Sequence, residues 1–297
     1  MKMSVFTGSG VAIITPFKDN GDVDFEALAK LLDFQVENGT DAIVICGTTG
    51  EASTLTDEEQ IETVAFTVDH IKGRVPVVAG AGSNNTIHGE ALSRSLEAVG
   101  ADALLHVTPY YNKTSQKGLY EHFAVMADSV HIPIILYNVP GRTGMDLKPE
   151  TVARLAAFDN IVAIKDATGN LATTVDLRSQ CPADFDIYSG NDDVTVPVLS
   201  CGGAGVISVL ANIFPKEVHD MCALWQQGDQ AGALAIQCRF QKLVHILFSE
   251  PNPIPVKAAV HMRGLPAGGY RAPMTTPTDA TIAALKVEMT RLGALEG

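Results

Sequence analysis

The sequence predicts an α/β fold, a (β/α)8 or TIM barrel with a C-terminal helical appendage. Up to residue 209, eight short apolar segments alternate with longer amphipathic segments. Residues 38–43 are echoed at residues 99–104, and each stretch has the pattern of a helix end, a glycine stop and a strand start. Eight strand–helix units close a barrel of this type, and a doubly wound sheet is the alternative. Beyond Trp225 only helix-like segments remain, so we expect a catalytic barrel over residues 1–224 and a helical region over residues 225–297.

The expected strands are short apolar runs bounded by turn residues. They cover residues 11–15, 42–46, 75–79, 104–108, 134–138, 161–165, 185–189 and 205–209. The uncharged stretch over residues 194–215 resembles a membrane span, but Pro197, Gly202 and Gly205 interrupt it. Such punctuation predicts a short helix, a turn and a buried strand instead.

The expected helices carry recognisable start and stop signals. Asp24 can cap a helix that runs to residue 38, where Gly39 ends it. Thr56 and Glu59 form the pattern of a capping box for a helix over residues 56–72. The remaining helices are expected at residues 86–99, 119–130, from 149 onward, 171–180, 231–248, 255–263 and 278–292.

Composition narrows the class of partner and the compartment. The net charge is −13, from 34 acidic and 21 basic residues, which disfavours binding to nucleic acid or to an anionic membrane. The five cysteines include no CxxC pair, which favours reduced thiols in a cytoplasmic protein. The first ten residues lack the apolar core of a signal peptide.

The sequence lacks the usual signatures of cofactor and metal sites. No HExxH motif occurs, the eight histidines are dispersed, and no Walker A or GxSxG motif is present. Gly80 and Gly82 follow an expected strand without the third glycine of a dinucleotide site. We therefore expect neither a cofactor nor a metal ion.

Lys165 ends the expected strand over residues 161–165 and is the main candidate for chemistry. Side chains alternate along a strand, so Lys165 should point the same way as Ile161 and Ala163, into the barrel. A lysine in apolar surroundings has a lowered pKa, and a neutral amine is what a Schiff-base lysine needs. The alternative is a side chain that extends from the strand end into water.

Other polar residues follow neighbouring strands. Gly47 and Gly50 enclose Thr48 and Thr49 in a turn that suits a small carboxylate. Tyr137 should share the face of Ile135 and enter the barrel mouth. Arg142 lies just beyond that strand, where it could hold a carboxylate or form a surface salt bridge.

Six motifs together resemble the dihydrodipicolinate synthase family, a group of pyruvate-dependent class I aldolases that includes N-acetylneuraminate lyase. They are Gly47-Thr-Thr-Gly-Glu51, Thr108-Pro-Tyr-Tyr-Asn112, Leu136-Tyr-Asn-Val-Pro-Gly-Arg-Thr143, Ile164-Lys-Asp-Ala-Thr-Gly169, Gly205-Val-Ile-Ser208 and Glu250-Pro-Asn-Pro-Ile-Pro-Val-Lys257. The resemblance runs from Gly10 to beyond Pro273. It implies condensation of pyruvate with L-aspartate 4-semialdehyde in lysine and diaminopimelate biosynthesis, by a tetramer built as a dimer of dimers. A sugar-acid lyase of the same family and a non-catalytic keto-acid sensor are the alternatives.

The same resemblance implies a role for each candidate residue. Lys165 forms the imine with pyruvate. Tyr137, Thr48 and Tyr111 form a proton relay, and Tyr111 reaches the site of a neighbouring subunit. The substrate-binding residues implied are Thr49 for the pyruvate carboxylate, Arg142 for the semialdehyde carboxylate, and Gly190 and Ile207 for the pocket lining.

Three positions depart from the family pattern. Lysine-inhibited members carry glutamate where His88 stands, and often histidine where Gln60 stands, so we expect little lysine feedback. Asp166 replaces the usual glutamate. Because it alternates to the face opposite Lys165, we expect burial and the Tyr137 hydroxyl, rather than Asp166, to tune the lysine.

Overall fold

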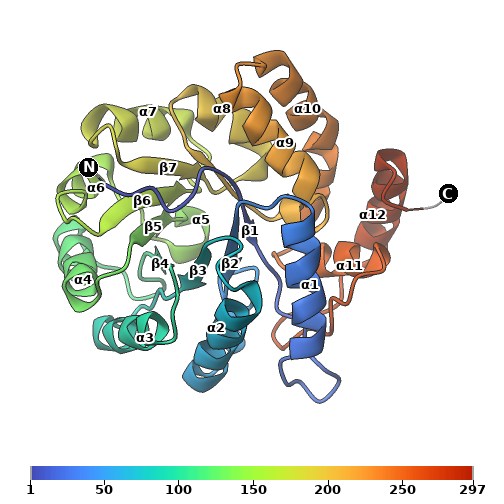
Figure 1. The fold of residues 1–297 in the computed structure, drawn as a ribbon, viewed down its shortest axis with the longest axis horizontal. Coiled ribbons are helices and arrows are strands. Elements are labelled where there is room, and N and C mark those ends of the chain that lie inside the picture. Colours follow the sequence, from blue (N-terminus) through green and yellow to red (C-terminus); the bar gives the residue numbers. More distant parts are fainter. Residues whose placement is uncertain (1, 296–297) are drawn as a thin grey trace.

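Eight parallel strands close into a barrel with helices on the outside (Figure 1). The structure is a computed structural model that describes residues 2–295. Each strand pairs with the next in sequence, and β8 pairs with β1. The strands are β1 (Gly8–Ala12), β2 (Ala42–Ile45), β3 (Val77–Gly80), β4 (Ala103–Val107), β5 (Ile134–Asn138), β6 (Ile161–Asp166), β7 (Asp186–Ser189) and β8 (Gly205–Ser208). The predicted (β/α)8 barrel is therefore confirmed, and the doubly wound sheet is ruled out.

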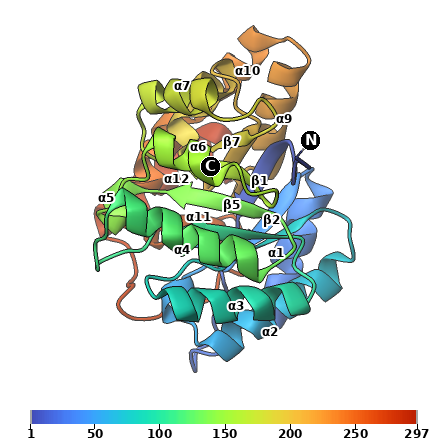
Figure 2. The same cartoon turned by 90° about the vertical axis from the view of Figure 1, so that its left-hand side faces the viewer.

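Helices that follow the strands cover the barrel, as Figure 2 shows from the side for α3, α4, α6 and α7. The helices of the barrel are α1 (Phe25–Glu37), α2 (Asp57–Ile71), α3 (Thr86–Ala98), α4 (Gln116–Ser129), α5 (Pro140–Thr143), α6 (Pro149–Leu155), α7 (Leu171–Gln180), α8 (Thr195–Ser200) and α9 (Pro215–Gln226), with the 3-10 turns η1 (Ala52–Thr54), η2 (Asp192–Val194) and η3 (Leu210–Asn212). The predicted cap at Asp24 and the capping box of Thr56 and Glu59 are both present. The uncharged stretch divides into α8, a turn and β8, as its glycines predict.

Three helices differ from the prediction. The short α5 was not expected. α9 was not expected, although Pro215 stands at its first position and its buried side chains, Val218, Met221 and Cys222, recur at helical spacing. Proline is favoured there because its missing N–H has no partner in a first turn. α4 begins three residues before its predicted start, because the Ser115 hydroxyl accepts from the Gly118 N–H at 3.2 Å.

The first strand lies three residues earlier than predicted, at Gly8–Ala12 rather than residues 11–15. Its early residues pair with β8, where Gly8 faces Gly205. A Cβ on Gly205 would lie 1.9 Å from the Gly8 carbonyl oxygen, so only glycine permits this approach. The apolar run that marked the predicted strand extends beyond the paired segment into the loop.

The two faces of the strands bury different cores. The barrel interior contains Ile135, Tyr137, Ala163, Tyr188 and Ile207, and the outer faces pack against the helices. At the N-terminal end of the barrel, the Phe6 ring stacks on Tyr188 with centroids 4.4 Å apart. The Tyr188 hydroxyl donates to the Phe6 carbonyl at 2.6 Å, so the segment before β1 closes this end.

A register shift changes one predicted side-chain direction. The pairing of β5 with β6 skips one residue, so that Ile134 faces Ile161 but Ile135 faces Ala163. Ile161 consequently belongs to the outer core, and the prediction that it shares the face of Lys165 is wrong. Ala163 does lie in the interior. Lys165 and Tyr137 are register partners on neighbouring strands.

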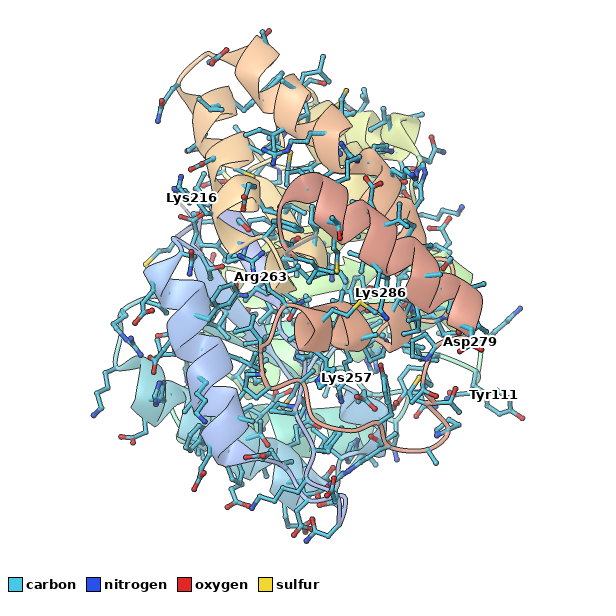
Figure 3. All side chains as sticks on the ribbon, turned by 90° about the vertical axis from the view of Figure 1, so that its right-hand side faces the viewer. Tyr111, Lys216, Lys257, Arg263, Asp279 and Lys286 are labelled. Atoms are coloured by element: carbon cyan, nitrogen blue, oxygen red, sulfur yellow. The ribbon has the colours of Figure 1, made fainter. Side chains whose placement is uncertain are left out.

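The C-terminal region consists of α10 (Gln230–Leu247), α11 (Ile254–Met262) and α12 (Asp279–Leu292). α10 packs on α9, and α12 packs on α10 and α11 (Figures 1 and 3). The proposed division at residue 224 falls in the last turn of α9. Within residues 2–295, none of the helices combines the length and the apolar character needed to span a bilayer.

Candidate active site

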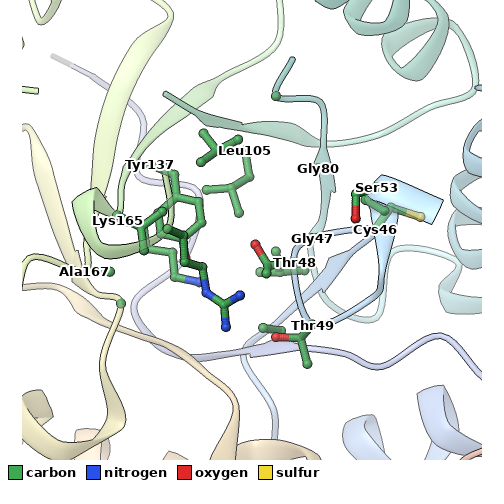
Figure 4. A pocket seen from close by; sticks show the side chains of 18 of the residues that line it. Cys46, Gly47, Thr48, Thr49, Ser53, Gly80, Leu105, Tyr137, Lys165 and Ala167 are labelled. Atoms are coloured by element: carbon green, nitrogen blue, oxygen red, sulfur yellow. The ribbon is translucent and has the colours of Figure 1, made fainter. Parts of the chain in front are cut away.

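A cavity of about 440 Å³ opens at the C-terminal ends of the strands. This is the end at which (β/α)8 barrels carry their active sites. Of the predicted site residues, Thr48, Thr49, Tyr137, Arg142, Lys165 and Gly190 line it. Figure 4 shows Lys165 and Tyr137 side by side, with Thr48 and Thr49 across the cavity.

Lys165 lies at the inner end of the cavity and is only 6% exposed. Its Nζ is 4.4 Å from the centroid of the Tyr137 ring. Burial lowers the pKa of Lys165 to about 8, with a further decrease from the positive charge of Arg142 and an opposing increase from Asp192. The amine is therefore available in its neutral form far more often than that of a surface lysine.

Imine formation at Lys165 should accelerate with rising pH and level off above pH 8, because only the neutral amine attacks a carbonyl. With a pKa of about 8, about a tenth of the amine is neutral at pH 7, against about 0.04% for an ordinary lysine. Stopped-flow measurement of adduct formation with pyruvate between pH 6 and pH 10 checks this. A midpoint above pH 10 would contradict it.

Tyr137 is buried beside the lysine at the end of β5. Burial raises the pKa of its phenol, and the Arg142 charge and a hydrogen bond with the Thr48 side chain oppose the shift. At neutral pH the group is therefore a protonated hydroxyl, which can donate one proton and accept another. That property suits a proton carrier between Lys165 and Thr48.

The threonine turn, residues 47–50, faces this pair from the end of β2. The Thr49 hydroxyl accepts from Asn252 Nδ2 at 2.9 Å, and the Gly50 carbonyl accepts from the Thr15 hydroxyl at 2.7 Å. The turn is thus fixed from two separate parts of the chain.

Arg142 lies in α5 and also lines the cavity. Its Nη2 donates to the Asn252 carbonyl at 3.4 Å. It forms no salt bridge among the described residues, so the predicted alternative of a surface ion pair is not present. Its guanidinium retains free donors for an anionic group in the cavity.

Two predicted residues lie elsewhere in this single chain. Tyr111 is 93% exposed, adopts a φ of 71° and is not among the cavity-lining residues; Figure 3 shows it at the edge of the molecule. Ile207 packs in the barrel interior and is not among the cavity-lining residues. Gly190 does line the cavity, and a Cβ there would lie 2.6 Å from the Cβ of Ala167.

Two buried residues near the site were not anticipated from the sequence. The Asp192 carboxylate accepts from the Ser208 hydroxyl at 2.5 Å and from the Val209 N–H at 2.9 Å, and its charge raises the pKa of Lys165. Asn252 bridges Thr49 and Arg142. The only sequence signal for Asp192 is that an acidic residue follows a predicted strand. Asn252 lies in the motif Glu250–Lys257, to which the family resemblance assigns no role.

Asp166 is not the counter-ion of Lys165, as expected. Its carboxylate accepts from the Thr168 N–H and the Thr174 hydroxyl, both at 3.0 Å. The charges that shift the pKa of Lys165 are those of Asp192 and Arg142. Burial is the main cause of the lowered pKa, as predicted. The Asp192 charge opposes it, and the added decrease comes from Arg142 rather than from the Tyr137 hydroxyl.

The cavity continues toward α2 and α3, where Asp57, Gln60 and His88 line it. His88 Nε2 lies 2.9 Å from Asp57 Oδ1, and His88 Nδ1 lies 2.9 Å from the Ser83 hydroxyl. The imidazole is therefore held on both sides by groups of this chain.

The family model described as "Dihydrodipicolinate synthetase family" matches residues 5–291. The 4-hydroxy-tetrahydrodipicolinate synthase of Caldicellulosiruptor saccharolyticus is 54% identical over 284 residues, which cover 96% of each chain. The synthase of Clostridium novyi is 51% identical, also over 96% of each chain.

A solved structure gives the same result for the fold. The dihydrodipicolinate synthase of Acinetobacter baumannii, in a chloride-inhibited form complexed with pyruvate, superposes with a TM-score of 0.95 at 42% identity. The match covers 98% of this chain and the whole of that one.

Proposed function

The chain belongs to the dihydrodipicolinate synthetase family, and we propose on that basis that it condenses pyruvate with L-aspartate 4-semialdehyde. The product is 4-hydroxy-tetrahydrodipicolinate, an intermediate of lysine and diaminopimelate biosynthesis. The observation that carries the proposal is the buried Lys165 beside Tyr137 at the inner end of the cavity.

The first half of the reaction makes a nucleophile from pyruvate. The neutral Lys165 amine attacks the keto carbon of pyruvate, and loss of water gives a protonated imine. The imine withdraws electrons, so a proton leaves C3 and an enamine forms. Tyr137 carries these protons together with Thr48, since its phenol stays protonated at neutral pH.

The second half builds the product and frees the enzyme. The enamine carbon attacks the aldehyde of the semialdehyde, and the new oxygen takes up a proton. The amino group of the semialdehyde then attacks the imine carbon, closes the ring and displaces Lys165. Thr49 holds the pyruvate carboxylate, and Arg142 holds that of the semialdehyde. Both residues line the cavity.

Gly190 and Ile207 complete the proposed binding site in different ways. Gly190 lines the cavity and packs so closely against Ala167 that a Cβ there would clash with it. Ile207 lies on β8 in the barrel interior, where its side chain packs in the core. No cofactor or metal ion is required for this chemistry, because the lysine itself is the electron-withdrawing group once it forms the imine.

We place the reaction in a cytoplasmic homotetramer, a dimer of dimers in which Tyr111 enters the site of a neighbouring subunit as part of the proton relay. The support is the near-complete exposure of Tyr111 in a single chain. Its left-handed backbone is costly for a tyrosine and implies a requirement beyond local packing. Sedimentation velocity gives the number of subunits.

A direct assay separates this function from the sugar-acid lyase alternative. The protein should produce 4-hydroxy-tetrahydrodipicolinate from pyruvate and L-aspartate 4-semialdehyde. It should release no pyruvate from N-acetylneuraminate or from a 2-keto-3-deoxy sugar acid. Faster turnover of either sugar acid would overturn the proposal. A pyruvate adduct without turnover of any of these substrates would favour the keto-acid sensor.

Lysine should have little effect on the proposed reaction. His88 stands where a carboxylate would be needed to pair with the ammonium group of lysine, and it is already bound to Asp57. We expect the rate to be unchanged in 1 mM L-lysine, measured against sodium chloride of equal ionic strength. Inhibition at sub-millimolar lysine would contradict this.

A further inference from the structure

The threonine turn is bracketed by two residues with unfavourable backbone conformations. Cys46 has a φ of 53° and Glu51 a φ of 55°, both in the left-handed region that favours glycine. Such conformations persist only where the surrounding structure holds them. The residues that hold Glu51 therefore help to set the turn that carries Thr48 and Thr49.

Glu51 is held by a buried lysine from the C-terminal region. Its Oε1 accepts from Lys257 Nζ at 2.7 Å, and both side chains are almost fully buried, at 1% and 0% exposure. Lys257 stands on α11, one of the helices of the C-terminal region (Figure 3). Its ammonium group also donates to the carbonyls of Thr15, at 2.9 Å, and of Gly269. All three donors of the lysine are thus used, and they join three separate parts of the chain.

Arg271 binds the segment that follows the threonine turn, from Glu51 to Thr54. Its backbone N–H donates to Glu51 Oε2 at 3.3 Å, and its guanidinium donates to the Thr54 carbonyl at 2.8 Å. The guanidinium also forms a salt bridge with Glu59 at the start of α2. Glu51, Lys257 and Arg271 together form what we call the C-terminal clamp.

The clamp lies close to the groups proposed to bind the carboxylates. Asn252, five residues before Lys257, donates to Thr49 and accepts from Arg142. Thr15, whose carbonyl binds Lys257, donates its hydroxyl to the Gly50 carbonyl. The clamp therefore reaches the threonine turn at two points, through Glu51, which follows Gly50 in the chain, and through Thr15.

We infer that Glu51 and Lys257 are positioning residues, which hold the threonine turn in the conformation that binds the pyruvate carboxylate. The inference rests on the proposed function, because it takes pyruvate as the ligand of the turn. It assigns the helical region after the barrel a part in building the active site of its own chain.

The test uses the double variant E51Q/K257M in the full-length protein. Removing both charges avoids the isolated buried charge that either K257M alone or E51A alone would leave. The adduct that borohydride traps on Lys165 is measured by intact mass against pyruvate concentration. We expect the pyruvate concentration at half-saturation to rise about tenfold or more, as for loss of charge-assisted contacts. The pH midpoint of imine formation should remain near that of the wild type.

The matched control is K242M/E288Q. It removes another lysine–carboxylate pair of the C-terminal region, 3.2 Å apart, in which the carboxylate is fully buried. It contacts neither the turn nor the clamp, so its half-saturation for pyruvate should match that of the wild type. E51Q alone is the milder variant, because its amide oxygen can still accept from Lys257, and it should raise half-saturation about fivefold.

The outcomes separate this inference from the proposed function. If the wild type forms no adduct, the proposed function fails and the inference fails with it. If the wild type forms the adduct and both E51Q and the double variant saturate at the wild-type pyruvate concentration, the inference alone fails. An equal increase in the K242M/E288Q control would likewise overturn it, because the effect would then be general destabilisation of the C-terminal region.

Discussion

Replacing Lys165 with alanine should abolish the covalent adduct with pyruvate and lower kcat at least about 10³-fold, since removal of a covalent nucleophile costs this much or more. The residue combines burial, a pKa of about 8 and a place at the inner end of the cavity. No other lysine among the residues that the structure describes lines that cavity, so none can substitute for it.

Intact-mass spectrometry after treatment with pyruvate and borohydride measures the adduct directly. The control is Lys286→Ala, which removes an exposed lysine on α12 and should leave both adduct and rate unchanged. An adduct that persists in Lys165→Ala would show that the imine forms elsewhere. An adduct absent from the wild type would refute the Schiff-base chemistry itself.

Replacing Tyr137 with phenylalanine should slow imine formation about 10²-fold or more, the usual contribution of a positioned proton carrier. The phenyl ring keeps the packing against Lys165 Nζ, at 4.4 Å in the wild type, so the change removes little besides the hydroxyl. The pKa of Lys165 should change little, because burial, Arg142 and Asp192 set it.

Rapid-mixing kinetics of adduct formation check this prediction, with the pH profile measured in parallel. The control is Tyr120→Phe, because Tyr120 lies on α4 outside the cavity-lining set. Wild-type rates in Tyr137→Phe would refute the proton-relay role. A slower rate with a displaced pH midpoint would instead mean that the hydroxyl acts by changing the basicity of the lysine.

The sequence was most informative where local pattern alone determines geometry. The alternation of side chains along strands placed Tyr137 and Lys165 on inward faces, and the structure makes them register partners. The same rule failed for Ile161, because the register shift between β5 and β6 depends on both strands and has no signature within one. Pairing between β1 and β8 likewise moved the first strand onto its glycines.

The residues that were missed are those whose role depends on distant contacts. Asp192 is buried because groups at the end of β8 donate to its carboxylate. Asn252 reaches Thr49 across 203 residues of sequence. Neither contact changes the local hydrophobic pattern, so no periodicity could reveal it. The role of Tyr111 cannot be tested in a single chain for a related reason, because the contacts proposed for it are with another subunit.

The C-terminal clamp also has a consequence for the chain during its synthesis. Glu51 and Lys257 are separated by 206 residues, which a ribosome takes about 10–40 s to add at the usual 5–20 residues per second. During that time the threonine turn has been synthesised but the residues that hold it have not. The unfavourable backbone conformations that flank the turn are then not stabilised by any contact with them. The pyruvate site should therefore mature last, so that a ribosome-bound chain halted before Lys257 emerges would contain every catalytic group and still bind its first substrate poorly.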